Sequence, residues 1–274
     1  MNWSLAMSDA RHTWDEIAAA WRRERPQSLW RRHSDWIHER LLERWLPPAG
    51  GKALKTDLFD EAFGGGLCRA LRSRGFKVTG VDISPRVCQV AREADAELLA
   101  VTADVRRLPF ADNSFDVILS NSTLDHFDSE ADIAAALDEL ARLLKPGGTL
   151  VITMDNPSNP VVSLRALLPQ RLLMAAGILK YPVGVTCGAA RLRTLLASRG
   201  LAAQESMAIM HCPRVLAIPI AGLLGERLGS RFLAALRVFE RLEDWPTRFL
   251  TGHFVAVRAL KTDSFALKAR SDGA

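Results

Sequence analysis

Short apolar segments alternate with longer amphipathic segments between residues 52 and 155, and no other feature of the sequence restricts the fold as strongly. This alternation is typical of βαβ units, in which a helix connects two parallel strands. Because such connections are almost always right-handed, the helices cover both faces of the sheet. The sequence therefore predicts an α/β fold with a doubly wound, mostly parallel sheet. The expected strands are 53–59, 77–82, 98–102, 115–120, 149–154 and 253–260, the expected helices are 67–73, 85–94 and 130–144, and a tight turn is expected at 146–148.

Composition argues against several classes of protein. The net charge is +5, but acidic residues are interleaved with the arginines of 22–44, as on a solvated helix face, so no nucleic-acid partner is expected. Four scattered cysteines form no CxxC pair, so neither a metal site nor a disulfide framework is expected. The start of the chain has no apolar signal-peptide region, and no run reaches the roughly 18 apolar residues of a membrane span. We therefore expect a cytoplasmic protein.

The ends of the expected strands carry residues suited to a nucleoside ligand, and ligands of open α/β sheets bind at the carboxyl ends of the strands. Three glycines, 64–66, follow the first strand and allow the backbone to approach a ligand closely. Asp82 ends the second strand, where a carboxylate can accept hydrogen bonds from a ribose diol. Asp104 follows the third strand, in position to accept from an exocyclic adenine amine, and 121–126 follow the fourth. Taken singly, each feature also fits a plain turn, a helix cap or a satisfied core histidine.

Taken together, three stretches resemble the class I methyltransferase family that depends on S-adenosylmethionine (SAM), in its small-molecule branch. The stretches are VTGVDIS, ADVRRLPFADNSFDVILSNSTLDHF and LARLLKPGGTLVIT, and they lie within the region of resemblance, residues 77–154. The resemblance implies SAM as the cofactor and a Rossmann-like sheet of seven strands. It places Asp82 on the ribose hydroxyls with Ile83 beside the adenine. It also places Asp104 and Val105 at the adenine, and Asn121 with the residues up to His126 at the methionine end and the reaction face.

The first motif departs from the family pattern of an acidic residue followed by GxGxG. Counting back from Asp82, Gly65 takes the place of the third glycine, whereas Phe63 and Glu61 fall where the other two belong. Asp57, Asp60 and Glu61 remain as acidic groups that could bind the amino group of the cofactor. The predicted cofactor-binding residues are therefore Asp57, Glu61, Gly64, Gly65, Gly66, Asp82, Ile83, Asp104, Val105 and Asn121.

Methyl transfer from a sulfonium is an in-line displacement, so the protein mainly has to hold the acceptor close and aligned. His126 is the candidate general base, because its position and the ordinary pKa of histidine suit that role. The position after the fourth strand reads SNST and lacks the Asn/Asp-Pro-Pro-aromatic motif of enzymes that methylate nucleic-acid bases. A small or lipid-like metabolite is therefore the expected substrate.

The regions on both sides of this core are expected to cover the site. Residues 1–48 hold six of the seven tryptophans and fit two amphipathic helices, and we expect them to extend the SAM-binding domain at 52–274. Residues 156–246 are expected to contain a helical insertion over the substrate. The apolar stretch 213–245 fits a lid that touches a membrane surface, but it also fits a buried helical pair or a dimer face, so monomer and homodimer both remain open.

Two other functions compete with the methyltransferase interpretation. The unusual first motif would also suit an accessory protein that keeps the fold and binds SAM without turnover. A nicotinamide-dependent oxidoreductase would share the carboxylate at Asp82. It would, however, require a GxGxxG that opens a helix, which this chain lacks.

Overall fold

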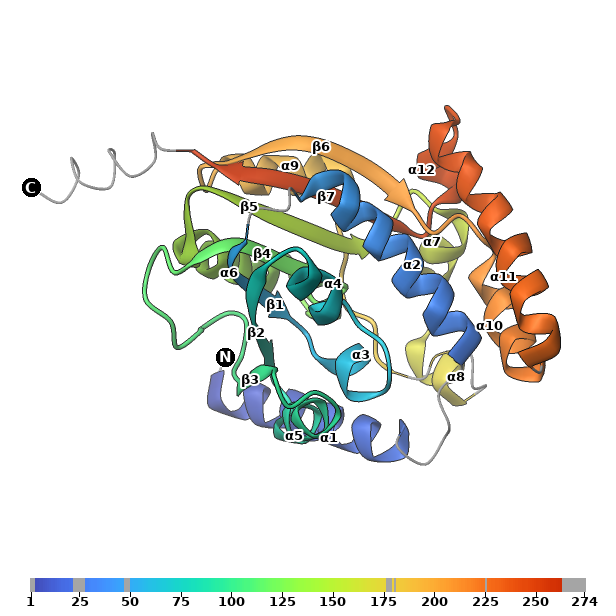
Figure 1. The fold of residues 1–274 in the computed structure, drawn as a ribbon, viewed down its shortest axis with the longest axis horizontal. Helices are drawn as coiled ribbons and strands as arrows, with labels where there is room; N and C mark the ends of the chain where they lie inside the picture. Colours follow the sequence, from blue (N-terminus) through green and yellow to red (C-terminus); the bar gives the residue numbers. More distant parts are fainter. Residues whose placement is uncertain are drawn as a thin grey trace, which may run out of the picture.

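The computed structural model describes residues 3–21, 28–46, 50–175, 179, 181–224 and 226–262, so 22–27 and 47–49 of the N-terminal extension lie outside the described residues. Its centre is a seven-stranded sheet with the order β3-β2-β1-β4-β5-β7-β6 (Figure 1). The first five strands are parallel, and β7 runs antiparallel to both β5 and β6. The strands are β1 Gly51–Thr56, β2 Phe76–Asp82, β3 Leu99–Thr102, β4 Phe115–Asn121, β5 Leu144–Asp155, β6 Leu201–Ile209 and β7 Phe254–Lys261. This sheet confirms the predicted Rossmann-like α/β class.

Helices cover both faces of the sheet and both flanks of its carboxyl edge (Figure 1). The helices of the N-terminal half are α1 Trp3–Trp21, α2 Ser28–Trp45, α3 Phe59–Ala62, α4 Cys68–Ser73, α5 Pro85–Ala94, the 3₁₀ turn η1 Leu124–His126 and α6 Glu130–Leu143. Those of the C-terminal half are α7 Pro160–Leu167, α8 Gln170–Ala175, α9 Ala189–Ala197, α10 Arg214–Leu223, α11 Glu226–Phe239, the 3₁₀ turn η2 Glu240–Asp244 and α12 Arg248–Thr251.

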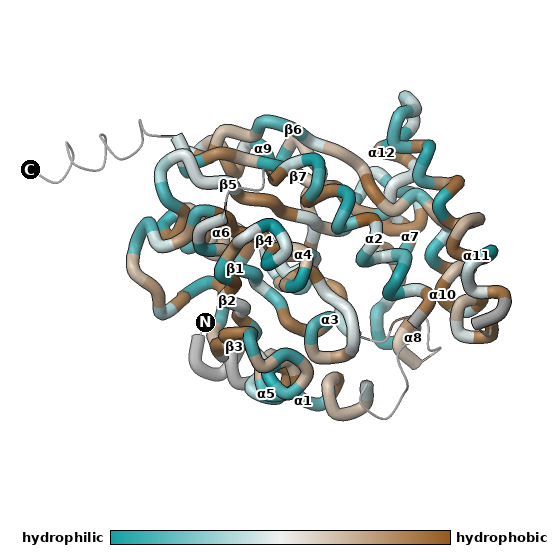
Figure 2. The backbone as a smooth tube through the Cα atoms, in the orientation of Figure 1, coloured by the Kyte–Doolittle hydropathy of each residue, from teal (hydrophilic) through white to brown (hydrophobic). Residues whose placement is uncertain are grey.

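Alternation of side chains along the central strands divides the core into two layers. Val117 and Leu119 of β4 point into the layer that contains α2, α4 and α5, whereas Ile118 points into the layer that contains α6 and α9. All three side chains are buried, as expected for a parallel strand that is covered on both faces. The hydrophobic colour of the inner strands in Figure 2 follows from this double burial.

Three sequence-based expectations were wrong in detail. The first strand was expected to reach Phe59 but ends at Thr56, because the Asp57 carboxylate accepts the N–H of Phe59 at 2.9 Å and turns the chain into α3. The turn expected at 146–148 lies inside β5. There, Phe115 of β4 pairs with Leu144 of β5 and Val117 pairs with Thr149. One residue of β4 is thus matched by four residues of β5, which form a bulge. No strand was expected at β6, whose short and polar side chains leave it half-exposed at the sheet edge.

The flanking regions pack on the core and on each other. Helix α1 lies along α5, and α2 packs against α10 and α11, so the N-terminal and C-terminal flanks meet (Figure 1). The region 156–246 contains β6 in addition to the expected helices. Among the described residues, no helix has both the length and the apolar character needed to span a bilayer.

A buried ion pair joins the end of β1 to the start of α4. Lys55 Nζ lies 2.9 Å from Glu61 Oε2, and the two side chains are 1% and 4% exposed. Glu61 Oε1 accepts the N–H groups of Leu67 and Cys68 at 2.8 and 3.2 Å, which caps α4. Burial alone would lower the pKa of Lys55, but the carboxylates of Glu61 and Asp57 hold it above its ordinary value. Lys55 therefore stays charged, and its contact with Glu61 anchors the whole β1–α4 loop.

Replacing Glu61 by Gln keeps an oxygen for the α4 cap but leaves the buried Lys55 ammonium with Asp57, whose Oδ2 lies 3.7 Å away, as its remaining counter-charge. Breaking one side of a buried pair costs about 3–5 kcal/mol, and we expect the free energy of unfolding to fall by about this amount in urea titrations of Glu61→Gln. Glu130→Gln is the matched control, because Glu130 pairs with Arg191 on the surface and both side chains are about half-exposed. Equal stability of the two variants would show that the buried pair does not anchor the loop.

Candidate active site

A cavity of about 1130 Å³ opens at the carboxyl ends of β1, β2 and β4. The strand order reverses between β1 and β4, because β2 and β3 extend to one side of β1 while β5, β7 and β6 follow β4 on the other. In open α/β sheets, the crevice at such a reversal is the usual place for a ligand. The wall combines the strand ends with side chains from α1, α2, α7 and α10.

Most of the predicted site residues meet at this cavity. They come from four separate strand ends, so only the folded sheet brings them together. The predicted residues on the cavity wall are Asp57, Asp82, Ile83, Asp104, Val105, Asn121 and His126.

The glycine-rich loop and Glu61 are not part of the cavity wall. Instead, the glycines pack against carboxylates of this chain. A Cβ on Gly66, whose φ is +99°, would lie 2.4 Å from the Glu61 carboxyl group, and a Cβ on Gly65 would lie 2.7 Å from Asp35 Oδ2. Glu61 itself is engaged by Lys55 and by the first turn of α4. The geometry therefore gives no support to the predicted cofactor contacts of Glu61, Gly64, Gly65 and Gly66, and Asp57 remains as the acidic candidate after β1.

One end of the cavity is crowded with carboxyl groups. Burial raises the pKa of Asp57 to about 8 and that of Asp82 to about 6. Burial, together with the nearby charge of Asp60, raises the pKa of Asp35 to about 7. Asp60 is paired with Arg31 at 2.6 Å. At neutral pH this end therefore holds carboxyl groups that are partly protonated, and a bound cation would favour their ionised form.

Asp82 and Asp104 are already oriented by the protein. Asp82 accepts the N–H groups of Leu58 and Ser84 at 3.0 and 2.9 Å, so both carboxylate oxygens are held at the end of β2. Arg106 pairs with Asp104 at 2.6 Å and also with Asp132 at 2.6 Å. Each oxygen of Asp82 has a second lone pair and can still accept a hydrogen bond from a ligand. Each oxygen of Asp104 already accepts two hydrogen bonds from Arg106, so a ligand there would have to take the place of part of this pairing.

His126 lies at the cavity within an aromatic group. Its ring is 4.9 Å from that of Trp14 and 5.6 Å from that of Tyr181, both in edge-to-face geometry. Nδ1 lies 3.2 Å from the carbonyl oxygen of Pro182. Because a carbonyl only accepts, Nδ1 must carry the proton, and in the neutral ring Nε2 is then the acceptor.

A second polar group lies elsewhere on the cavity wall, and the sequence did not predict it. Asp155 forms an ion pair with Arg165, and its Oδ1 lies 3.3 Å from Nε2 of His253. Burial lowers the pKa of His253 to about 4, so this imidazole is neutral at pH 7. Burial opposes ionisation of Asp155, but the neighbouring His253 and the charge of Arg165 hold its pKa well below the usual range. The Arg214 guanidinium lies 5.0 Å above the ring of Phe254.

Asp155 could have been found from the sequence, because it ends the fifth strand at the same edge of the sheet. The arginines could not, because they come from helices α7 and α10 outside the strand pattern. The tryptophans of the N-terminal extension also reach the cavity: Trp14, Trp21 and Trp30 are on its wall.

Comparisons with known proteins agree with this geometry. Residues 62–152 match a family model described as "Methyltransferase domain". The chain is 34% identical over 143 residues to a malonyl-[acyl-carrier protein] O-methyltransferase of Enterobacter lignolyticus, covering 50% of this chain and 52% of the relative. It is also 34% identical over 143 residues to a demethylmenaquinone methyltransferase of Corynebacterium kroppenstedtii, covering 52% of this chain and 58% of the relative. The chain thus spans little more than half the length of these relatives.

A solved structure shares the fold. It is an S-adenosylmethionine dependent methyltransferase from Mesorhizobium loti, with a TM-score of 0.56 and 21% identity, covering 82% of this chain and 97% of the other. At this identity the likeness shows the fold alone, while the family match and the two relatives show a methyltransferase domain. Residues 62–152 thus belong to a methyltransferase domain.

Proposed function

We propose that this chain transfers the methyl group of SAM to a small or lipid-like metabolite bound in the large cavity. The observation that best supports this proposal is the meeting of Asp82, Asp104 and Asn121, from three strand ends, around one cavity at the reversal of strand order. SAM supplies a methyl group on a positively charged sulfur, which leaves as a neutral thioether. The remaining task of the protein is to hold donor and acceptor in line, which can supply roughly 7–11 kcal/mol of the barrier.

The carboxyl-rich end of the cavity suits the charge of this cofactor. SAM carries a sulfonium and an ammonium group, and Asp57 and Asp35 offer carboxyl groups that a cation would ionise. Asp82 would take the ribose hydroxyls, while Asp104 and Val105 would face the adenine. Ile83 would lie beside the ring, and Asn121, held by the Thr153 hydroxyl at 2.7 Å, would face the methionine part.

Asp82→Asn tests this placement. The substitution removes the charge but keeps one acceptor oxygen, and hydrogen bonds to charged groups are worth about 1.5–3 kcal/mol. We therefore expect the affinities for SAM and for S-adenosylhomocysteine to fall by about tenfold to a hundredfold in isothermal titration.

Asp138→Asn is the control for this experiment, because Asp138 is 64% exposed and is not on the cavity wall. Circular dichroism checks that both variants are folded. If the unchanged protein bound neither ligand, the methyltransferase proposal would fail. If it bound SAM without turnover, the accessory function would replace it.

The pH dependence of SAM binding tests the carboxyl-rich end. Asp57, with a pKa of about 8, and Asp35, with a pKa of about 7, hold protons in the free protein at pH 6 and lose them as the pH rises. A cation binds the ionised form better, so SAM affinity should rise between pH 6 and pH 8, by about tenfold for each carboxyl whose pKa drops by about one unit on binding. S-adenosylhomocysteine, which lacks the charged sulfur, should change less, and Asp57→Asn should flatten the profile. A SAM affinity that is constant over this range would contradict the assignment.

The rest of the cavity wall suits an acceptor that is largely apolar. Helices α7, α8 and α10 contribute aliphatic side chains, and several of these also reach the surface, such as Leu164 and Val215, which are each 60% exposed. Apolar wall and apolar rim are thus continuous, so a lipid-like acceptor could enter from this side. Arg165 and Arg214 add positive charge for a polar head.

Three expectations about the whole chain stay predictions: membrane contact through 213–245, the choice between monomer and homodimer, and the domain limits.

His126 is our proposed general base. Its Nδ1–H donates to Pro182, which orients Nε2 as the acceptor for a proton from the substrate. The backbone N–H of His126 donates to the carbonyl of Thr123 at 3.3 Å, and the packed rings of Trp14 and Tyr181 hold the imidazole in place.

Turnover can be measured as formation of S-adenosylhomocysteine with malonyl-acyl carrier protein and with the reduced form of demethylmenaquinone, the substrate types named for the two relatives. We expect one of them to be methylated. With that substrate, His126→Asn should lower kcat by about 10²–10⁴ while leaving SAM affinity unchanged. His12→Asn is the control, because His12 is an exposed residue on α1. An unchanged kcat in His126→Asn would remove the base assignment and leave the methyltransferase proposal intact.

A further inference from the structure

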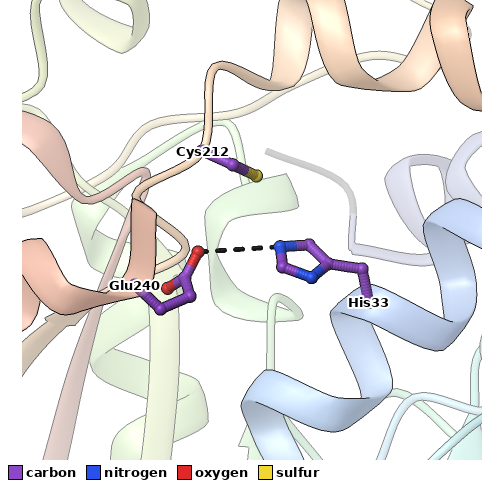
Figure 3. Close-up of side chains that lie close together, drawn as sticks. All are labelled: His33, Cys212 and Glu240. Atoms are coloured by element: carbon purple, nitrogen blue, oxygen red, sulfur yellow. Dashed lines mark ion pairs between the residues drawn. The ribbon is translucent and has the colours of Figure 1, made fainter. Parts of the chain in front are cut away.

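Three side chains with metal-binding atoms meet in the interior, outside the large cavity (Figure 3). His33 comes from α2, Cys212 from the segment between β6 and α10, and Glu240 from the start of η2. Their exposed fractions are 0%, 4% and 4%, and one ligand atom from each lies within 4.8 Å of the other two. Figure 3 shows the imidazole, the thiol and the carboxylate pointing toward a common centre.

His33 is the least satisfied member of this cluster. Neither of its ring nitrogens has a hydrogen-bond partner among the described residues, although both are inaccessible to solvent. The nearest charged atom, Glu240 Oε1, lies 3.6 Å from Nε2, which is too far for a hydrogen bond. A buried polar group without a partner is costly, and natural proteins rarely retain one without a reason.

Glu240 is buried with only part of its hydrogen-bonding capacity used. Its carboxylate oxygens accept the backbone N–H of His211 at 3.1 and 3.3 Å. The negative charge then faces the Cys212 thiol. A cation at the centre would compensate the carboxylate, take the lone pair of His33 and displace the thiol proton, so one ion would satisfy all three groups.

We propose that His33, Cys212 and Glu240 form a binding site for one zinc ion. Imidazole, thiolate and carboxylate are the ligand types of zinc. With zinc–ligand distances of about 2.0–2.3 Å, tetrahedral ligands lie about 3.4–3.7 Å apart. The measured 3.6 Å between Nε2 and Oε1 already fits, and the pairs at up to 4.8 Å need a shift of about 1 Å.

Water can complete the coordination as the fourth ligand. A second cavity of about 100 Å³ has Glu240 on its wall, together with residues of α2 and β6, and this volume has room for a water molecule. A zinc ion with three protein ligands keeps its fourth coordination position free for water or another ligand. It is not on the wall of the large cavity, however, so its role is structural.

The position of the cluster explains what the ion would do. In the sequence, His33 stands between Trp30 and Ser34, and both of these are on the wall of the large cavity. Cys212 likewise stands between Met210 and Arg214, which are also on that wall. An ion bound here would link the N-terminal extension to the C-terminal region at the side of the active site. Binding energy of this kind contributes directly to folding.

Cobalt substitution and metal analysis test the site on the full chain. The protein, purified without chelator, should carry one zinc per chain by mass spectrometry. After zinc removal, Co²⁺ should produce a thiolate-to-cobalt charge-transfer band and raise the melting temperature. Cys212→Ser should lose the bound zinc, the band and the temperature shift. Cys187→Ser is the matched control, because Cys187 is another buried thiol, 6% exposed, and should keep all three.

A second variant keeps the test decisive if Cys212→Ser fails to fold. His33→Phe retains a ring that can pack against Trp30 and Trp36 but removes the nitrogen ligand, so it should fold and bind no zinc. Circular dichroism reports whether each variant is folded and needs neither the metal nor a cofactor. A folded unchanged protein that carries no zinc and gives no cobalt band would overturn the proposal. A band that persists in folded Cys212→Ser would overturn it as well.

Discussion

The buried ion pair between Lys55 and Glu61 determines how the chain leaves its first strand. The family pattern has an acidic residue and three spaced glycines in this region, and here the loop is arranged around a lysine instead. Lys55 draws Glu61 inward, and Glu61 in turn holds the first turn of α4. The glycines are then needed because Gly65 and Gly66 pack directly on the carboxyl groups of Asp35 and Glu61. The atypical motif is thus held by contacts within the loop and with α2.

This arrangement leaves the cavity with a distinct distribution of charge. Carboxyl groups gather at the ends of β1 and β2, whereas Arg165 and Arg214 enter from the C-terminal helices, and apolar side chains cover much of the remaining wall. The carboxyl groups repel one another and are poorly solvated, so a cation is the ligand that best relieves them. A cationic cofactor at one end and a mainly apolar acceptor with a polar head at the other would match this division.

The two flanks of the chain are more than packing for the sheet. Aromatic rings from α1 and α2 and aliphatic side chains from α7 and α10 complete the cavity that the strand ends begin. Helices α2, α10 and α11 also contact one another, which makes the wall depend on segments about 200 residues apart in sequence. The cluster of His33, Cys212 and Glu240 lies at this junction. An ion at this position would stabilise the wall without touching the reacting groups.

Local patterns in the sequence determined the strand–helix alternation, the sheet class and the strand-end acids Asp82 and Asp104, because a parallel sheet brings every strand end to one edge. The same rule would have found Asp155. Local patterns could not reveal that Glu61 faces Lys55 rather than the cavity. Nor could they reveal that Arg214 lies near Trp30, at 5.4 Å from its ring, or that a scattered cysteine meets a histidine and a glutamate. Lys55 and Glu61 are six residues apart and meet because the chain turns into α3 between them. The other contacts join residues far apart in sequence, and only the packing of the flanks on the sheet selects them from many partners of equal chemistry.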